Sequence, residues 1–271
     1  MEDTQYKSDE ECEETEEYVK SNNPEAIGND ENLEKEDAFK KYDYIPERFI
    51  TSNLAPRSFN EYLLIKKKFK AICKILNGEH PGTGFFCKIN LNGKEIKALF
   101  TNNHVLGSNR IKVGSKINLL NNKSEITIEI NKKRFICSSR NLDYTCIQIL
   151  PEDNINDFLK IDRQIYEEYM EEYSNDSIMD EYKLQNLILV QYCRKNEGAI
   201  YYSTGSLENF DGTRIFYKIP IQFGAKGAPI LSLNNSLDVI GMHRKCGSRK
   251  KRILNNGIFF NRILIDIQSK I

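Results

Sequence analysis

The sequence lacks the side-chain patterns on which several common kinds of site depend. Its three histidines, His80, His104 and His243, lie far apart, and none of the seven cysteines forms a CxxC pair. Structural zinc needs four cysteine or histidine ligands at short spacings, so we expect no metal site and no cofactor. The cysteines are scattered and odd in number, which favours free thiols in a reducing, cytoplasmic compartment.

Long apolar runs are also absent from the sequence. No segment approaches the roughly 20 apolar residues that are needed to cross a bilayer, so we expect no membrane span. The first residues lack the basic start and apolar stretch of a secretory signal. Both absences agree with the cytoplasmic compartment that the cysteines suggest.

The net charge of zero conceals a strong asymmetry along the chain. Residues 1–50 contain 17 acidic against 6 basic residues, a formal charge of −11, and the remainder carries +11. This acidic tail has few large apolar residues, so we expect it to be disordered. It should be attracted to the basic remainder at low salt, either as a solubilising tail or as a cover over a binding site.

Short β-type runs bounded by Gly, Asn and Lys begin near Phe69. Seven of them fall within residues 68–152 and six more within residues 183–271. Residues 153–182 between the two groups are acidic and tyrosine-rich, and they indicate a helical or irregular connector. This pattern predicts an all-β chain, either a sandwich or a pair of barrels, with a short C-terminal helix packed on the second group.

Five phrases in the β-rich region stand in a recognisable order. They are "GTGFF", "TNNHV" around His104, "LDYTCIQI" headed by Asp143, "GAKGAP" around Lys226, and "GMH" ending at His243. A lone histidine is most often an ordinary surface or core residue. Here Asp143 stands at the head of a strand, where a carboxylate can orient the imidazole of His104.

These phrases resemble those of trypsin-like serine peptidases, and most closely the glutamyl endopeptidase branch. The resemblance covers residues 68–270 and implies two antiparallel Greek-key β-barrels of the chymotrypsin type. It implies that His104 is the general base and that Asp143 orients it. It also implies that the N–H groups of Gly224 and Lys226 form the oxyanion hole, and that His243 belongs to a pocket for acidic side chains.

The nucleophile position departs from the family pattern. Relatives of this kind carry Gly-x-Ser-Gly there, whereas this chain has Lys226. A lysine amine attacks only in its neutral form, and the amide it would form does not turn over like a serine ester. Three interpretations of Lys226 stay open, namely a solvated turn lysine, a partner of Asp143, or a partner of a ligand carboxylate.

Three functions follow from these observations. The first is an inactive peptidase homologue whose cleft binds a peptide or protein segment, including acidic ones, as a strand added to the edge of the second barrel. The second is an active serine-type endopeptidase that cleaves after acidic residues. The third is nucleic-acid binding through the basic runs Ile65–Lys70 and His243–Arg252. We do not expect it, because such runs usually form solvated loops and no RNA-binding motif accompanies them.

Overall fold

The structure is a computed structural model in which part of the chain is described. The described residues are 59–76, 81–162, 164–165, 182, 186–193, 199–233, 236–247 and 254–271. All of them belong to one compact unit, Glu47–Ile271. The acidic tail, residues 1–50, and most of the expected connector, residues 153–182, lie outside the described residues.

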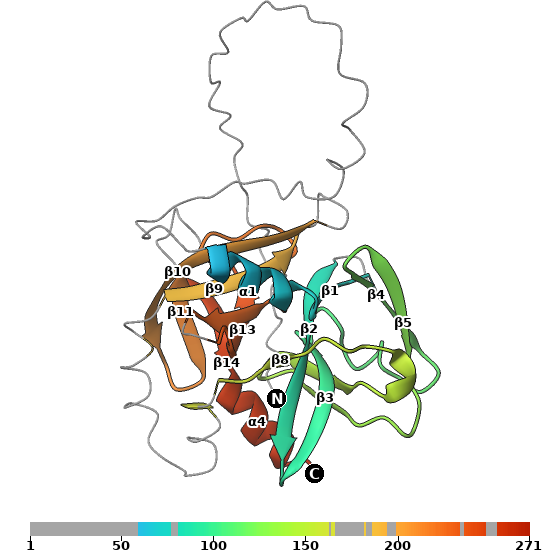
Figure 1. Cartoon of the computed structure of the whole chain (residues 1–271). Coiled ribbons are helices and arrows are strands. Elements are labelled where there is room, and N and C mark those ends of the chain that lie inside the picture. The colour runs from blue at the N-terminus through green and yellow to red at the C-terminus, as the bar shows by residue number, and fades with distance from the viewer. Residues whose placement is uncertain are drawn as a thin grey trace, which may run out of the picture. The chain divides into compact units, whose positions relative to one another are not determined.

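The first group of strands forms one eight-stranded sheet, antiparallel except for its shortest strand (Figure 1). The strand order is β5-β4-β1-β2-β3-β7-β6, with β8 pairing in parallel with β2, so the sheet is the half-barrel of the double-barrel fold that we expected. Its strands are β1 (Ile72–Ile75), β2 (Gly82–Leu91), β3 (Lys94–Thr101), β4 (Lys116–Asn121), β5 (Ser124–Glu129), β6 (Ile136–Ser139), β7 (Tyr144–Gln148) and β8 (Leu159–Lys160).

The second group forms a closed six-stranded barrel in the order β10-β11-β14-β13-β12-β9. The ladder between β12 and β13 ends at Pro229 and Met242, whereas β13 continues to Lys245 and pairs there with β14, so the addition of a peptide strand to this barrel stays a prediction. Its strands are β9 (Asn186–Tyr192), β10 (Ile200–Phe210), β11 (Arg214–Lys218), β12 (Pro229–Ser232), β13 (Val239–Lys245) and β14 (Asn255–Phe259).

Tight turns fix the register of the hairpins in the first sheet. Asn92 and Gly93 join β2 to β3 with φ values of 52° and 78°, and Leu91 pairs directly with Lys94. Two successive residues with positive φ match the right-handed twist of paired strands, and Asn-Gly is the dipeptide that adopts this turn most readily. Asn122 and Lys123 make the same kind of turn between β4 and β5, with φ values of 46° and 69°.

Strand β2 is buried on both of its faces and lies between two hydrophobic cores. Phe86 packs inside the half-barrel, whereas Phe85 and Cys87 belong to a larger core that includes residues of the second barrel. Successive side chains of a strand point to opposite faces, so a strand between two cores is apolar at nearly every position. This explains the continuous apolar run of "GFFC" in the sequence.

Among the described residues, the α-helices α1 and α4 both differ from our expectation, and a short 3-10 helix, η1 (Pro151–Asp153), follows β7. Helix α1 (Phe59–Phe69) includes Ile65–Phe69, which we had taken as part of a solvated basic loop. Helix α4 (Phe260–Gln268) forms where we expected it, but it packs across both groups of strands rather than on the second alone. Neither of these described helices is long and apolar enough to cross a bilayer.

The contacts of α4 with the first sheet are specific. The ring centroid of Phe260 lies 5.0 Å from that of Phe100 and 6.2 Å from that of Phe85. Further along the helix, the hydroxyl of Tyr144 donates to the carboxylate of Asp266 at 2.5 Å. The helix follows β14 without a loop, so it ties the closed barrel to the half-barrel.

Candidate functional site

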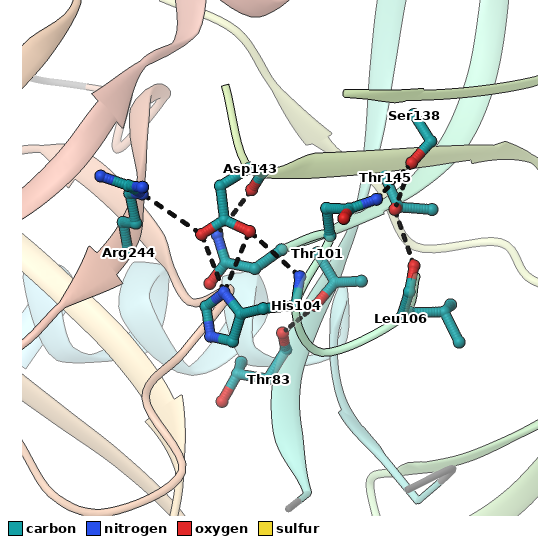
Figure 2. A network of polar contacts seen from close by, with 10 residues as sticks. Thr83, Thr101, His104, Leu106, Ser138, Asp143, Thr145 and Arg244 are labelled. Atoms are coloured by element: carbon teal, nitrogen blue, oxygen red, sulfur yellow. Dashed lines mark hydrogen bonds and ion pairs between the residues drawn. The ribbon is translucent and has the colours of Figure 1, made fainter. Parts of the chain in front are cut away.

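His104 and Asp143 form a hydrogen-bonded pair where β3 ends and β7 begins (Figure 2). Nδ1 of His104 lies 2.8 Å from Oδ2 and 3.0 Å from Oδ1 of Asp143, and the backbone N–H of His104 donates to Oδ1 at 3.0 Å. A carboxylate only accepts hydrogen bonds, so Nδ1 carries a proton and Nε2 is the acceptor of the neutral ring. The His104 side chain is 36% exposed and that of Asp143 is 8% exposed.

Strand pairing brings these two residues together across 39 positions of sequence. Thr101 at the end of β3 pairs with Thr145 in β7, so His104 leaves β3 beside the start of β7, where Asp143 lies. Asp143 has a φ of 53°, and its carbonyl accepts a hydrogen bond from Nδ2 of Asn102 at 3.0 Å. The ends of two neighbouring strands therefore hold the pair in place.

Arg244 also binds the carboxylate of Asp143, and the sequence analysis did not find this contact. Figure 2 shows that Arg244 reaches Asp143 from a different element than His104 does, with Nε 3.3 Å from Oδ2. The register of β13 against β14 shifts between His243 and Lys245, which makes Arg244 the extra residue of a bulge. Bulges redirect side chains. Arg244 follows Asp143 by 101 positions in the sequence, and no local sequence pattern signals the ion pair between them.

The turn from Gly224 to Ala228 is held against the His104 side of the half-barrel by backbone contacts. Thr83 donates its N–H to the carbonyl of Lys226 at 2.8 Å and its hydroxyl to the carbonyl of Gly224 at 2.7 Å. On the other side, the N–H of Gly227 donates to the carbonyl of His243 at 3.0 Å. The turn is therefore fixed between β2 of the half-barrel and β13 of the closed barrel.

Glycine is needed in the turn where it touches the half-barrel. Gly227 has a φ of +84°, and a Cβ there would lie 2.2 Å from the carbonyl oxygen of Thr83 and 3.2 Å from the backbone nitrogen of Asn102. Only a residue without a side chain allows such an approach. This approach places Lys226, the preceding residue, beside the segment that leads to His104.

Lys226 itself is half-buried, and it does not pair with Asp143. Asp143 is bound by His104 and Arg244 instead. Within the described ranges, Nζ of Lys226 has no hydrogen-bond acceptor and no ion-pair partner. Of the three interpretations of Lys226, pairing with Asp143 is therefore wrong.

Comparisons with known proteins identify the fold of the chain but find no relative by sequence. No protein-family model and no curated protein sequence matches the chain. Solved structures do match, among them a Glu endopeptidase in complex with MPD, with a TM-score of 0.50 and 14% identity over 74% of this chain and 90% of that chain. Deg5 matches with a TM-score of 0.52 and 17% identity over 79% and 95% of the two chains.

A third match is the inactive form of the Rv3671c protease, with a TM-score of 0.53 and 10% identity over 81% of this chain and 98% of that chain. These neighbours are trypsin-like serine proteases. The chain has the trypsin-like fold. At such low identity the likeness establishes the fold alone, and the roles of individual residues rest on their own geometry.

In this trypsin-like fold, His243 is completely buried rather than open to a ligand. Its side chain has 0% exposure, and Nδ1 lies 2.5 Å from the hydroxyl of Tyr217. Burial, followed by the charges of His104 and Lys226, lowers the pKa of His243 to about 3. Burial also raises the pKa of Tyr217 well above its usual value, so both side chains are uncharged near neutral pH.

Within the described residues, three buried cysteines and the metal-binding side chains are candidate alternatives to this site. Burial raises the pKa of Cys73, Cys87 and Cys146 well above the usual value for a thiol, so these cysteines do not form reactive thiolates. In the part of the chain that the structure describes, His, Cys, Asp and Glu nowhere form a group of three that could hold a metal ion.

Acidification should destabilise the fold through His243. An unfolded histidine takes up a proton near pH 6.5, whereas the buried ring does so only near pH 3. Between these values the unfolded chain binds one more proton, so unfolding becomes easier as the pH falls, by up to about 1.4 kcal/mol per pH unit. Urea unfolding at pH 7, 5 and 4 would measure this slope.

A matched pair of variants isolates the contribution of His243 to that slope. His243→Gln should remove it, because glutamine does not titrate. His104→Gln should keep most of it, because burial, the largest cause of the low pKa of His243, is unchanged. The same slope in the wild type and in His243→Gln would contradict the assignment.

Proposed function

We propose that this chain is a non-catalytic member of the trypsin-like fold that binds a peptide or protein segment. The observation that carries the proposal is the presence of Lys226 in the turn beside His104, at the position expected for a nucleophilic serine. The imidazole and its carboxylate are present, but the oxygen that attacks a peptide carbonyl and leaves again is not. His104 and Asp143 then serve as a preformed polar wall of the cleft.

Arg244 supports the same proposal through the charge of Asp143. In a serine peptidase the carboxylate stabilises the imidazolium that forms when the base takes the proton of the nucleophile. Here the carboxylate of Asp143 is shared with a guanidinium at 3.3 Å. Part of its negative charge is therefore compensated before any reaction begins, which weakens its hold on a protonated His104.

The charges of the cleft favour an acidic segment. Arg244 balances Asp143, which leaves the ammonium of Lys226 as an uncompensated positive charge beside the turn. The buried and neutral His243 contributes by anchoring the turn, since its backbone accepts from Gly227 and donates to Ala228. We therefore assign His243 a supporting role in a cleft whose selectivity for acidic groups comes from Lys226.

An activity and labelling assay tests the absence of catalysis. The wild type should not hydrolyse peptides with glutamate or aspartate before the scissile bond, and it should not react with a fluorophosphonate. Lys226→Ser should react with the fluorophosphonate, because it restores a hydroxyl next to His104. Lys226→Ala is the matched control, since it removes the lysine without supplying a nucleophile.

Steady hydrolysis by the wild type that disappears in His104→Ala would overturn the proposal in favour of an active endopeptidase. Labelling of Lys226→Ser that survives the further change His104→Ala would show that the serine reacts without the expected base. Removing the nucleophile of a serine peptidase triad lowers turnover by on the order of a million-fold, so the assay separates an active from an inactive protein by a wide margin.

A further inference from the structure

The turn that carries Lys226 has two backbone donors without an acceptor. The N–H groups of Ala225, Gly227 and Ala228 donate to the carbonyls of Gln222, His243 and Ala225. The N–H groups of Gly224 and Lys226 have no acceptor in the part of the chain that the structure describes. Backbone donors are nearly always satisfied by protein or by water, so two half-buried donors without a protein acceptor in one turn are open to an acceptor from outside.

A positive charge accompanies these two donors. The ammonium of Lys226 belongs to the same residue as one of them, and its charge helps to lower the pKa of the buried His243, so it acts within this region. Arg244 does not compete with it for a ligand, because its guanidinium is bound to Asp143. The turn therefore carries two unused N–H donors and one cation within three residues.

A carboxylate fits this combination better than a peptide carbonyl does. A carboxylate has two oxygens and a negative charge, so one oxygen can accept from the backbone and the charge can pair with the ammonium. A carbonyl within a continuous peptide is neutral, and its chain must also continue past the half-buried side chain of Lys226. A peptide that ends at the turn meets neither difficulty.

We propose that the cleft binds the free C-terminal carboxylate of a peptide, with Gly224 and Lys226 donating their N–H groups and Lys226 pairing through its ammonium. This inference rests on the proposed peptide-binding function and specifies its ligand. Lys226 replaces the nucleophile, and the turn then binds the C-terminal carboxylate of a peptide in place of the carbonyl of a continuing peptide chain.

Paired peptide sets test the inference on the whole chain. One set consists of N-acetylated tetrapeptides with each of the 20 amino acids at the last position as free acids, and the other contains the same peptides as C-terminal amides. For the peptides that bind, the free acid should bind at least about tenfold more tightly, as expected for charge-assisted hydrogen bonds. The glutamate and glutamine members separate this effect from that of an acidic side chain.

Two variants with the same change of charge locate the effect. Lys226→Met should abolish the preference for the free acids and leave the weaker binding of the amides. Lys218→Met removes an exposed lysine of β11 that pairs with Glu208, and it should keep the preference. Amide signals of Gly224 and Lys226 in nuclear magnetic resonance spectra should shift on binding of the free acids and less on binding of the amides.

The contrary outcomes are distinct. Equal affinity of acids and amides, or a preference that persists in Lys226→Met, would overturn the carboxylate inference and leave peptide binding in place. A preference only for the glutamate members, in acid and amide form alike, would assign Lys226 to an acidic side chain instead. Binding of no member of either set would overturn the proposed function together with the inference.

Discussion

Replacing Asp153 with alanine should lower the free energy of unfolding by about 3–5 kcal/mol, because it leaves a buried guanidinium without its partner. Arg134 and Asp153 have side-chain exposures of 1% and 5%. They meet through two contacts, Nη1 to Oδ2 at 2.6 Å and Nη2 to Oδ1 at 3.1 Å. The arginine also donates to the carbonyls of Glu129 and Gln148, so the pair joins the ends of β5 and β7.

Denaturant unfolding would measure this loss, with an exposed pair as the control. Glu208 and Lys218 lie 2.8 Å apart on the surface of the closed barrel. Glu208→Ala should cost less than about 1 kcal/mol, because water screens exposed ion pairs. Replacing both buried partners with apolar residues, as in Arg134→Met with Asp153→Leu, should be milder than Asp153→Ala alone. A loss in Asp153→Ala no larger than that in Glu208→Ala would contradict the prediction.

Gly227→Ala should disrupt the turn from Gly224 to Ala228 far more than the same change at Gly212 disrupts its own turn. Both glycines have a φ of +84°, so alanine carries a similar backbone penalty of about 1–2 kcal/mol at either position. At Gly227 the new methyl group would also meet the carbonyl of Thr83 at 2.2 Å and the hydroxyl of Thr101 at 2.5 Å. At Gly212 the nearest atom would be Nη2 of Arg262 at 4.0 Å.

The difference between these two variants is therefore the cost of the clash. We expect Gly212→Ala to fold normally with a modest loss of stability. Gly227→Ala should move the turn away from Thr83, lower the unfolding free energy by several kcal/mol and abolish peptide binding. Thermal unfolding together with peptide titration would measure both effects. Similar stability and similar binding in the two variants would show that the turn does not need its contact with β2.

The strands could be predicted from the sequence because their patterns are local. The run Gly82–Leu91 carries its own β pattern, and the structure forms β2 over the same residues. Helix α1 was missed although Ile65 and Phe69, four positions apart, are its buried residues. The three lysines between them drew attention to charge, whereas they occupy the last turn of the helix, where a positive charge is favoured by the helix dipole.

The candidate site could be predicted only in part. His104, Asp143, Gly224, Lys226 and His243 were all named from short motifs, and the structure brings their elements together. The contact of Arg244 with Asp143 depends on a bulge in β13 and on the docking of two strand systems, and neither leaves a mark in the local sequence. The burial of His243 and its hydrogen bond with Tyr217 depend on the same long-range packing.

Helix α4 has a consequence for the order in which the protein assembles. Phe85 and Phe100 are made 160 or more residues before Phe260, whose ring packs on both. During synthesis this apolar face of the half-barrel stays exposed until residue 260 has left the ribosome, which is the period in which a nascent chain is most prone to aggregate. The contact of Phe260 that joins the half-barrel to the closed barrel therefore forms only after the strands of the half-barrel have been made.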